Sequence, residues 1–149
     1  MEYKLEVVVV PVSDVDRAKA FYADQVGFVV DVDHSPNERF RVVQLTPPGS
    51  GCSITIGKGL SDDMAPGSIK GLQLVVADID AARADLASRG VGVSPVQHHD
   101  GNSMVDGHGD DWNSFVFFAD PDGNTWAVQE SPTLRAATAA SAPAVVEAG

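Results

Sequence analysis

Short apolar runs and one amphipathic segment alternate along the first half of the chain. A valine-rich run at 5–12 has the length and composition of a buried strand. Over 13–27, apolar residues recur at helical spacing between Ser13, the expected N-cap, and Gly27, which suits the position after a helix end. Further apolar runs predict strands at 28–32, 40–45 and 52–56. This half therefore predicts the order β-α-β-β-β.

The second half repeats that order. Asp14-Val15-Asp16 returns as Asp78-Ile79-Asp80, and Gly27 returns as Gly90. Strands are expected at 91–96, 114–119 and 125–129, the last two joined by the turn Asp120-Pro121-Asp122-Gly123-Asn124. A strand–helix unit that recurs in this way indicates two copies of one supersecondary motif.

The predicted fold class is α+β, with two tandem βαβββ modules forming cupped mixed sheets around a cleft. Module one spans 1–57, a Gly-, Ser-, Asp- and Pro-rich linker spans 58–70, and module two spans 71–130. The Ala- and Pro-rich tail at 131–149 is expected to be weakly ordered, with a helix at 136–140 if it docks on a partner. Each helix can cover one face of its sheet. The other face must meet the duplicate module, a second chain or a ligand.

The amino-acid composition argues against several kinds of binding partner. The net charge of −11 argues against nucleic acid and anionic membranes, both of which need a basic surface. It is compatible with cationic or neutral small molecules. No apolar run approaches the roughly 20 residues of a membrane span. The lone Cys52 excludes an intramolecular disulfide, which fits a cytoplasmic protein.

Two motifs and the repeat together carry a family resemblance. VSDVDRAKAFY, FFADPDGNTWAVQE and the paired modules resemble the vicinal oxygen chelate superfamily of glyoxalases, bleomycin-resistance proteins and extradiol dioxygenases, over about residues 5–130. In metal-dependent members this resemblance implies a divalent ion held by His, Gln or Glu from the first and last strand of each module. Matching the motifs places those positions on Val7, Thr55, Leu72 and Ala127. These side chains cannot replace the hydration shell of a hard cation. If the motif alignment is shifted by one residue, Gln73 is the only additional side chain that could bind a metal. We therefore expect no metal and no other cofactor.

Strand alternation predicts the lining of the cleft. Trp126, Val128 and Phe117 are expected to pack under the second helix. The cleft-facing set is mostly apolar and suits an organic ligand with a hydrophobic body. It comprises Val7, Val9, Ser53, Thr55, Leu72, Leu74, Val116, Phe118, Ala127 and Gln129.

The segment 97–113 is long for a hairpin connection and holds three of the four histidines. It could be a lid over the cleft, with Trp112 and Met104 closing an apolar pocket and His98 or His99 acting as acid–base residue. It could be a relocated metal site, although the histidine spacing matches no common zinc motif. It could also be a solvated polar loop.

Three functions stay open at this point. The first is a metal-independent protein that binds a small hydrophobic or cationic organic molecule, as drug-sequestering members of the superfamily do. The second is a glyoxalase-like lyase or isomerase whose catalytic groups lie in 97–113. The third is a non-catalytic interaction module with a closed cleft. A homodimer is expected, because cupped sheets with open edges find partners.

Overall fold

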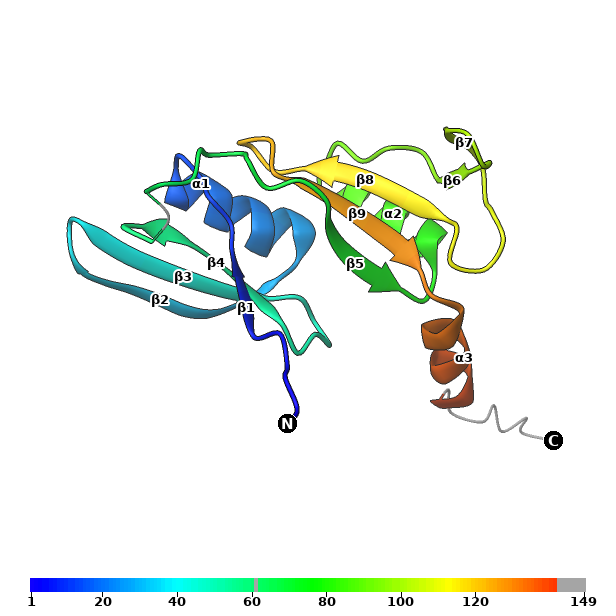
Figure 1. Ribbon diagram of the computed structural model, residues 1–149, viewed down its shortest axis with the longest axis horizontal. Helices are drawn as coiled ribbons and strands as arrows, with labels where there is room; N and C mark the ends of the chain where they lie inside the picture. Colours follow the sequence, from blue (N-terminus) through cyan, green and yellow to red (C-terminus); the bar gives the residue numbers. More distant parts are fainter. Residues whose placement is uncertain (61, 142–149) are drawn as a thin grey trace.

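The computed structural model describes residues 1–60 and 62–141 and contains two sheets, each with a helix packed against it (Figure 1). In module one, β1 pairs in parallel with β4, and the sheet order is β1-β4-β3-β2. Its elements are β1 (Val7–Val9), α1 (Val15–Ala20), η1 (Phe21–Val26), β2 (Val29–Asn37), β3 (Phe40–Thr46) and β4 (Ser53–Lys58).

Module two follows the same plan with one more strand. Here β5 pairs in parallel with β9, and the sheet order is β5-β9-β8-β6-β7. Its elements are β5 (Leu72–Val76), α2 (Ile79–Ser88), β6 (Gln97–His99), β7 (Met104–Asp106), β8 (Phe115–Ala119) and β9 (Thr125–Glu130). The predicted α+β fold of two tandem modules is confirmed.

Module two differs from the sequence prediction in the segment between α2 and β8. The segment 91–96 is not a strand, although it runs beside β8. The Phe117 N–H bonds to Ser94 Oγ in place of a backbone carbonyl, and Pro95 has no N–H to donate. The hairpin of β6 and β7 lies in the segment 97–113, which sequence patterning left without strands, because Gln97, His98 and His99 carry no β-forming signature.

The two helices begin alike. Asp14 and Asp78 cap them, each accepting the backbone N–H three residues on, at 3.0 Å. The expectation that Ser13 is the N-cap was wrong, because its N–H instead bonds to the Asp122 carboxylate in the turn before β9, at 3.1 Å. The first helix ends as expected at Gly27, whose φ of 92° is the left-handed conformation that favours glycine.

A shared aromatic core joins the modules. Figure 1 shows α1 lying between the two sheets. There Trp126 of β9 stacks on Phe118 of β8, with ring centroids 6.0 Å apart, and meets Phe28 edge-on. The Trp126 Nε1–H donates to the hydroxyl of Tyr22 at 3.0 Å, and that hydroxyl donates to Asp120 at 2.8 Å. The two halves therefore share one hydrophobic core.

The chain continues past β9 as α3 (Pro132–Ser141), which includes the stretch 136–140 that was expected to become helical on docking. The remainder of the predicted tail, 142–149, lies outside the described residues. None of the helices described here is both long and apolar enough to cross a membrane.

Candidate functional site

Strand register decides which side chains of module two face away from the helices. Phe118 pairs with Trp126 and Val116 pairs with Val128, so these four share the helix-facing side and are buried. Phe117 pairs with Ala127, on the opposite side of the sheet. We call this opposite side of module two the open face.

Five predicted positions were therefore wrong. Val116 and Phe118 do not face away from the helices, and Leu72 and Leu74 lie on the same side because they pair with Trp126 and Val128. Phe117, expected under the helix, lies on the open face. The physical reason is the packing of Phe118 and Trp126 against Tyr22 and Phe28, which fixes the phase of the alternation. The positions expected for Trp126 and Val128 are confirmed.

The open face presents an aromatic wall. The rings of Phe115 and Phe117 stack at 6.0 Å with an angle of 12° between their planes. Val75 of the neighbouring edge strand is about half exposed. A hollow of about 410 Å³ lies at the end of this sheet next to the β8–β9 turn, and Phe117 is the ring of the stacked pair that borders it. Its lining is Gly71, Phe117, Phe118, Ala119, Thr125, Trp126 and Ala127. It suits the planar apolar part of an organic molecule.

Polar groups border the wall on one side. The Gln73 amide Nε2 donates to Gln129 Oε1 at 2.7 Å, and Gln129 Nε2 donates to the Trp112 carbonyl at 2.7 Å. Gln129 thus lies on the open face, as predicted. Gln73 was missed as an open-face residue. Its polarity between Leu72 and Leu74 was the available signal.

In module one, the side of the sheet away from the helix carries more polar residues, of which Ser53 and Thr55 are buried. Val7 and Val9 of β1 pair with Ser53 and Thr55 of β4, on the side away from the helix, as predicted. The Ser53 hydroxyl lies 2.6 Å from that of Thr46. Contact of these residues with a ligand stays a prediction.

Two of the misplaced residues line a hollow between the modules instead. Leu74 and Phe118 border a space of about 250 Å³ together with Phe28, Pro47 and Arg89. The Arg89 guanidinium donates to the Val26 carbonyl at 3.3 Å, so module two helps to cap the end of η1. This hollow belongs to the junction of the modules.

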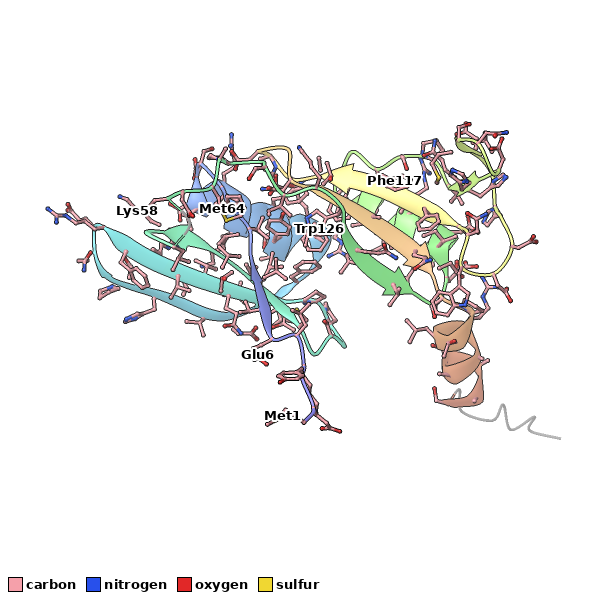
Figure 2. All side chains as sticks on the ribbon, in the orientation of Figure 1. Met1, Glu6, Lys58, Met64, Phe117 and Trp126 are labelled. Atoms are coloured by element: carbon pink, nitrogen blue, oxygen red, sulfur yellow. The ribbon has the colours of Figure 1, made fainter. Side chains whose placement is uncertain are left out.

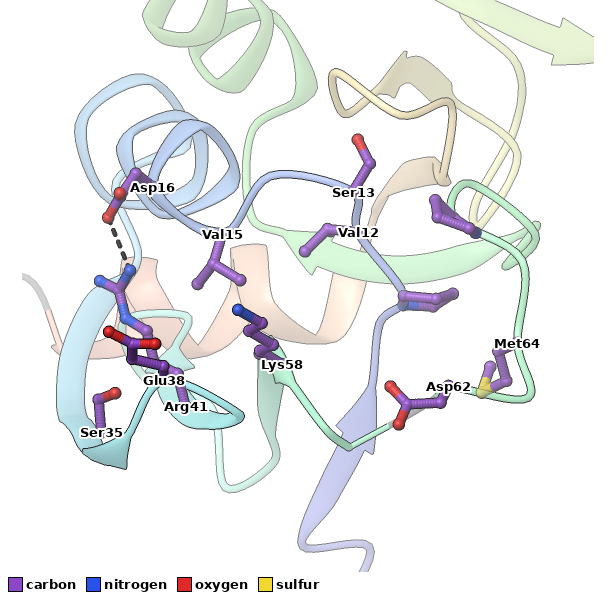
Figure 3. Close-up of a pocket in the computed structure, with 13 residues that line it drawn as sticks. Val12, Ser13, Val15, Asp16, Ser35, Glu38, Arg41, Lys58, Asp62 and Met64 are labelled. Atoms are coloured by element: carbon purple, nitrogen blue, oxygen red, sulfur yellow. Dashed lines mark hydrogen bonds and ion pairs between the residues drawn. The ribbon is translucent and has the colours of Figure 1, made fainter.

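A hollow of about 540 Å³ lies at the start of α1 (Figure 3). Arg41 reaches Asp16 at 2.7 Å and Asp33 at 2.9 Å, and Lys19 also binds Asp33. These hydrogen bonds from Arg41 and Lys19 hold the pKa of Asp33 well below its usual range. The charges of Arg41, Asp16 and Asp33 are thus largely paired with one another and with Lys19.

The comparison with family models agrees with this architecture. The model of the Glyoxalase/Bleomycin resistance protein/Dioxygenase superfamily matches residues 4–128. The chain belongs to this superfamily.

Solved structures of the superfamily are similar across nearly the whole chain. TnmS3, described as an antibiotic binding protein from Streptomyces sp. CB03234, is 33% identical, with a TM-score of 0.68, covering 87% of this chain and 97% of its own. A glyoxalase/bleomycin resistance protein from the same organism is 34% identical, with a TM-score of 0.65, covering 85% and 99%. A superfamily member from Sphaerobacter thermophilus DSM 20745 is 28% identical, with a TM-score of 0.69, covering 87% and 98%. No curated protein sequence matches the chain.

The metal site that the superfamily implies does not fit these residues. The matched position on β5 that faces away from the helix is Gln73, beside Ala127, and not Leu72. The set then becomes Val7, Thr55, Gln73 and Ala127, which offers neither a carboxylate nor an imidazole. Within residues 1–60 and 62–141, no group of three or more His, Cys, Asp and Glu side chains could hold a metal ion.

The histidines of 97–113 are separated. Gln97 pairs with Phe115, so alternation places His99 on the open side of the sheet and His98 on the other. His98 Nδ1 lies 2.9 Å from the Gly107 carbonyl, and His108 Nε2 lies 2.7 Å from Asp80 at the start of α2. The hairpin that carries His98 and His99 extends the outer edge of the sheet, beyond β8.

Trp112 lies just before β8, next to Asn113, whose side chain bonds to the backbone of His99. Its side chain is 46% exposed and lines a polar hollow with Asp110, Asp111, Glu130 and Arg135. Its φ of 65° is unusual for a residue other than glycine. Trp112 was expected to close an apolar pocket, but the hollow that it borders is lined mainly by charged side chains. The contact of Trp112 with the open face is made by its backbone carbonyl, which accepts the hydrogen bond from Gln129.

Proposed function

We propose that this protein binds a small organic molecule with a hydrophobic body, neutral or cationic, against the open face of module two, and that it does so without a metal. The observation that carries the proposal is the stacked pair of Phe115 and Phe117, with an apolar hollow beside it. Aromatic rings held in this way offer a planar ligand a preformed surface, so little ordering is needed on binding.

The polar residues beside the aromatic wall could make binding specific for one ligand. Gln73 and Gln129 offer amide donors and acceptors to a polar group of the ligand, next to the rings. The protein's net charge of −11 favours the approach of a cationic or neutral molecule over that of an anion. TnmS3, which is 33% identical and described as antibiotic binding, supports an antibiotic-like ligand.

We propose sequestration rather than catalysis as the role. The glyoxalase-like alternative needs an acid–base group beside the bound ligand and, in the metal-dependent members, a cation. His98 is turned to the opposite side from the wall, the Nδ1 of His99 on the side of the wall accepts the Gly101 N–H within the hairpin, and the matched ligand positions lack anionic and imidazole groups. We also propose a homodimer and, from the single cysteine, a cytoplasmic location.

A ligand screen tests the proposal. A panel of bleomycin and planar aromatic antibiotics is added to the protein, and binders are sought as an upward shift of the thermal midpoint. The affinity of each binder is then measured by calorimetry for the wild type, Phe117→Ala and Leu134→Ala. Phe117→Ala is expected to weaken binding roughly tenfold, because it removes half of the stacked pair.

Leu134→Ala is the control, since it trims another apolar side chain outside the buried core, on α3. It should leave the affinity unchanged. Equal weakening by both variants, or a panel without a single binder, would contradict the proposal.

A further inference from the structure

The outer edge of the open face carries a carboxylate beside the aromatic wall. Gln97 of β6 pairs with Phe115 of β8 on one side and with Asp106 of β7 on the other. Directly paired residues project from the same face of a sheet, so Asp106 lies on the open face, level with Phe115. Phe117, labelled in Figure 2, is the other ring of the wall, and β6 and β7 follow β8 on the side away from β9 (Figure 1). The wall therefore has a carboxylate on the side opposite to its amide border.

This carboxylate is held in place but its charge is not balanced. The Gln97 Nε2–H donates to Asp106 Oδ1 at 3.1 Å. Within residues 1–60 and 62–141, no other hydrogen bond and no ion pair engages the Asp106 side chain. The titratable neighbour on this face is His99, whose Nδ1 accepts the Gly101 N–H at 3.1 Å. A ring nitrogen that accepts a hydrogen bond carries no proton, so His99 in this arrangement does not supply the missing positive charge.

Strand spacing sets the shape of a ligand that could use both features. Neighbouring strands lie about 4.8 Å apart, and β7 is two strands from β8, so Asp106 lies about 10 Å from the row of rings. A planar body over Phe115 and Phe117 would reach this carboxylate only with a group on a short tether. The residue between them is Gln97, whose neutral amide does not repel a cation.

We propose that Asp106 makes the open face selective for a planar aromatic molecule that carries a protonated amine on a short tether. The inference rests on the proposed function, because the wall must hold the planar body. An ammonium group would donate a charge-assisted hydrogen bond to the carboxylate oxygen that Gln97 leaves unused. An anionic group on the same tether would be repelled.

The effect of Asp106 differs from that of the net charge. A net charge of −11 attracts a cation to the molecule as a whole. At physiological ionic strength, exposed charges are screened over about 8 Å, so a cation at the end of the tether responds mainly to the carboxylate beside it. Replacing Asp106 should therefore change selectivity more than replacing a distant acidic residue.

Three pyrene probes with the same ring and tether test this selectivity. Pyrenebutylamine is a cation, pyrenebutanol is neutral and pyrenebutanoate is an anion, and fluorescence anisotropy measures their affinities at pH 7. The wild type should bind the amine about fivefold more tightly than the alcohol, and the carboxylate least tightly. Asp106→Asn keeps an acceptor for Gln97 and loses the charge. It should bring the amine and the alcohol to within about twofold and leave the affinity for the alcohol unchanged.

Two further variants separate this charge from other causes. Asp24→Asn is the matched control, because Asp24 is an exposed carboxylate of η1 and its substitution changes the net charge by the same amount. It should keep the fivefold preference for the amine. Phe117→Ala should weaken all three probes by a similar factor, since it removes a ring that holds the pyrene.

The outcomes distinguish the inference from the proposed function. If the wild type binds the amine and the alcohol equally, the inference is overturned. The same holds if the preference survives Asp106→Asn or if Asp24→Asn removes it to the same extent. In these cases the proposed function stands, because pyrenebutanol still binds. If no probe binds, the wall does not hold a planar body, and the proposed function and the inference fail together.

Discussion

The two sides of the β8–β9 hairpin each carry a stacked pair of aromatic rings but differ in what packs against that pair. On the helix side, Phe118 and Trp126 stack in the shared core, where both are buried. On the open side, Phe115 and Phe117 stack in a similar way, but none of the helices that the structure describes covers them. Stacked rings thus hold the modules together on one side, and on the other they form the surface that we propose as the ligand site. Which role a ring has depends on the face it occupies, not on its residue type.

The largest expected effect lies on the helix side. Trp126→Ala removes a buried ring that touches three other aromatic side chains, so the free energy of unfolding should fall by about 3–5 kcal/mol. Urea denaturation measures it. Phe115→Ala trims the opposite face of the same hairpin and should cost about 1 kcal/mol or less. Equal losses for the two variants would show that the two sides are not distinct.

A smaller effect is expected at the polar centre of the core. Tyr22→Phe leaves the Trp126 Nε1–H and the Asp120 carboxylate without the hydroxyl between them, which should cost about 1–3 kcal/mol. Burial, with the nearby Asp120 charge, raises the pKa of Tyr22 well above its ordinary value. Above about pH 10 the unfolded chain therefore loses this proton while the folded chain keeps it, and stability falls as pH rises.

The contribution of Tyr22 to this pH dependence can be measured separately from that of the other titrating groups. In denaturation at a series of alkaline pH values, Tyr22→Phe should lose stability less steeply above pH 10 than the wild type. Tyr3→Phe is the control, because Tyr3 is exposed in the segment before β1 and its substitution should leave the slope unchanged. Parallel slopes for wild type and Tyr22→Phe would contradict the buried hydroxyl–carboxylate pair.

The architecture was predictable because each of its signals is local. The repeated Asp-apolar-Asp motif at the helix starts, the glycines after the helices and the turn at 120–124 each fix their own segment, even though Asp14 and not Ser13 proved to be the cap. The hairpin at 97–106 was missed for the converse reason. Gln97 and the two histidines after it become strand through pairing with Met104 to Asp106, not through their own propensity.

The candidate site was predictable in part. Val7, Val9, Thr55 and Gln129 face as expected. In β8, however, Phe115 to Phe118 are all apolar, so alternation divides them into two sets without showing which set meets the helix. Contacts with Tyr22 and Phe28, far away in sequence, make that choice.

The most direct test of metal-independent binding on the open face is calorimetry on metal-stripped protein. The protein is treated with EDTA, its metal content is checked by elemental analysis, and an antibiotic that binds in the screen is titrated with and without added Zn²⁺. The account predicts the same affinity in both titrations, to within about twofold. Two results together would contradict it: the protein as purified holds one metal ion per chain, and the stripped protein binds the antibiotic only after zinc is added.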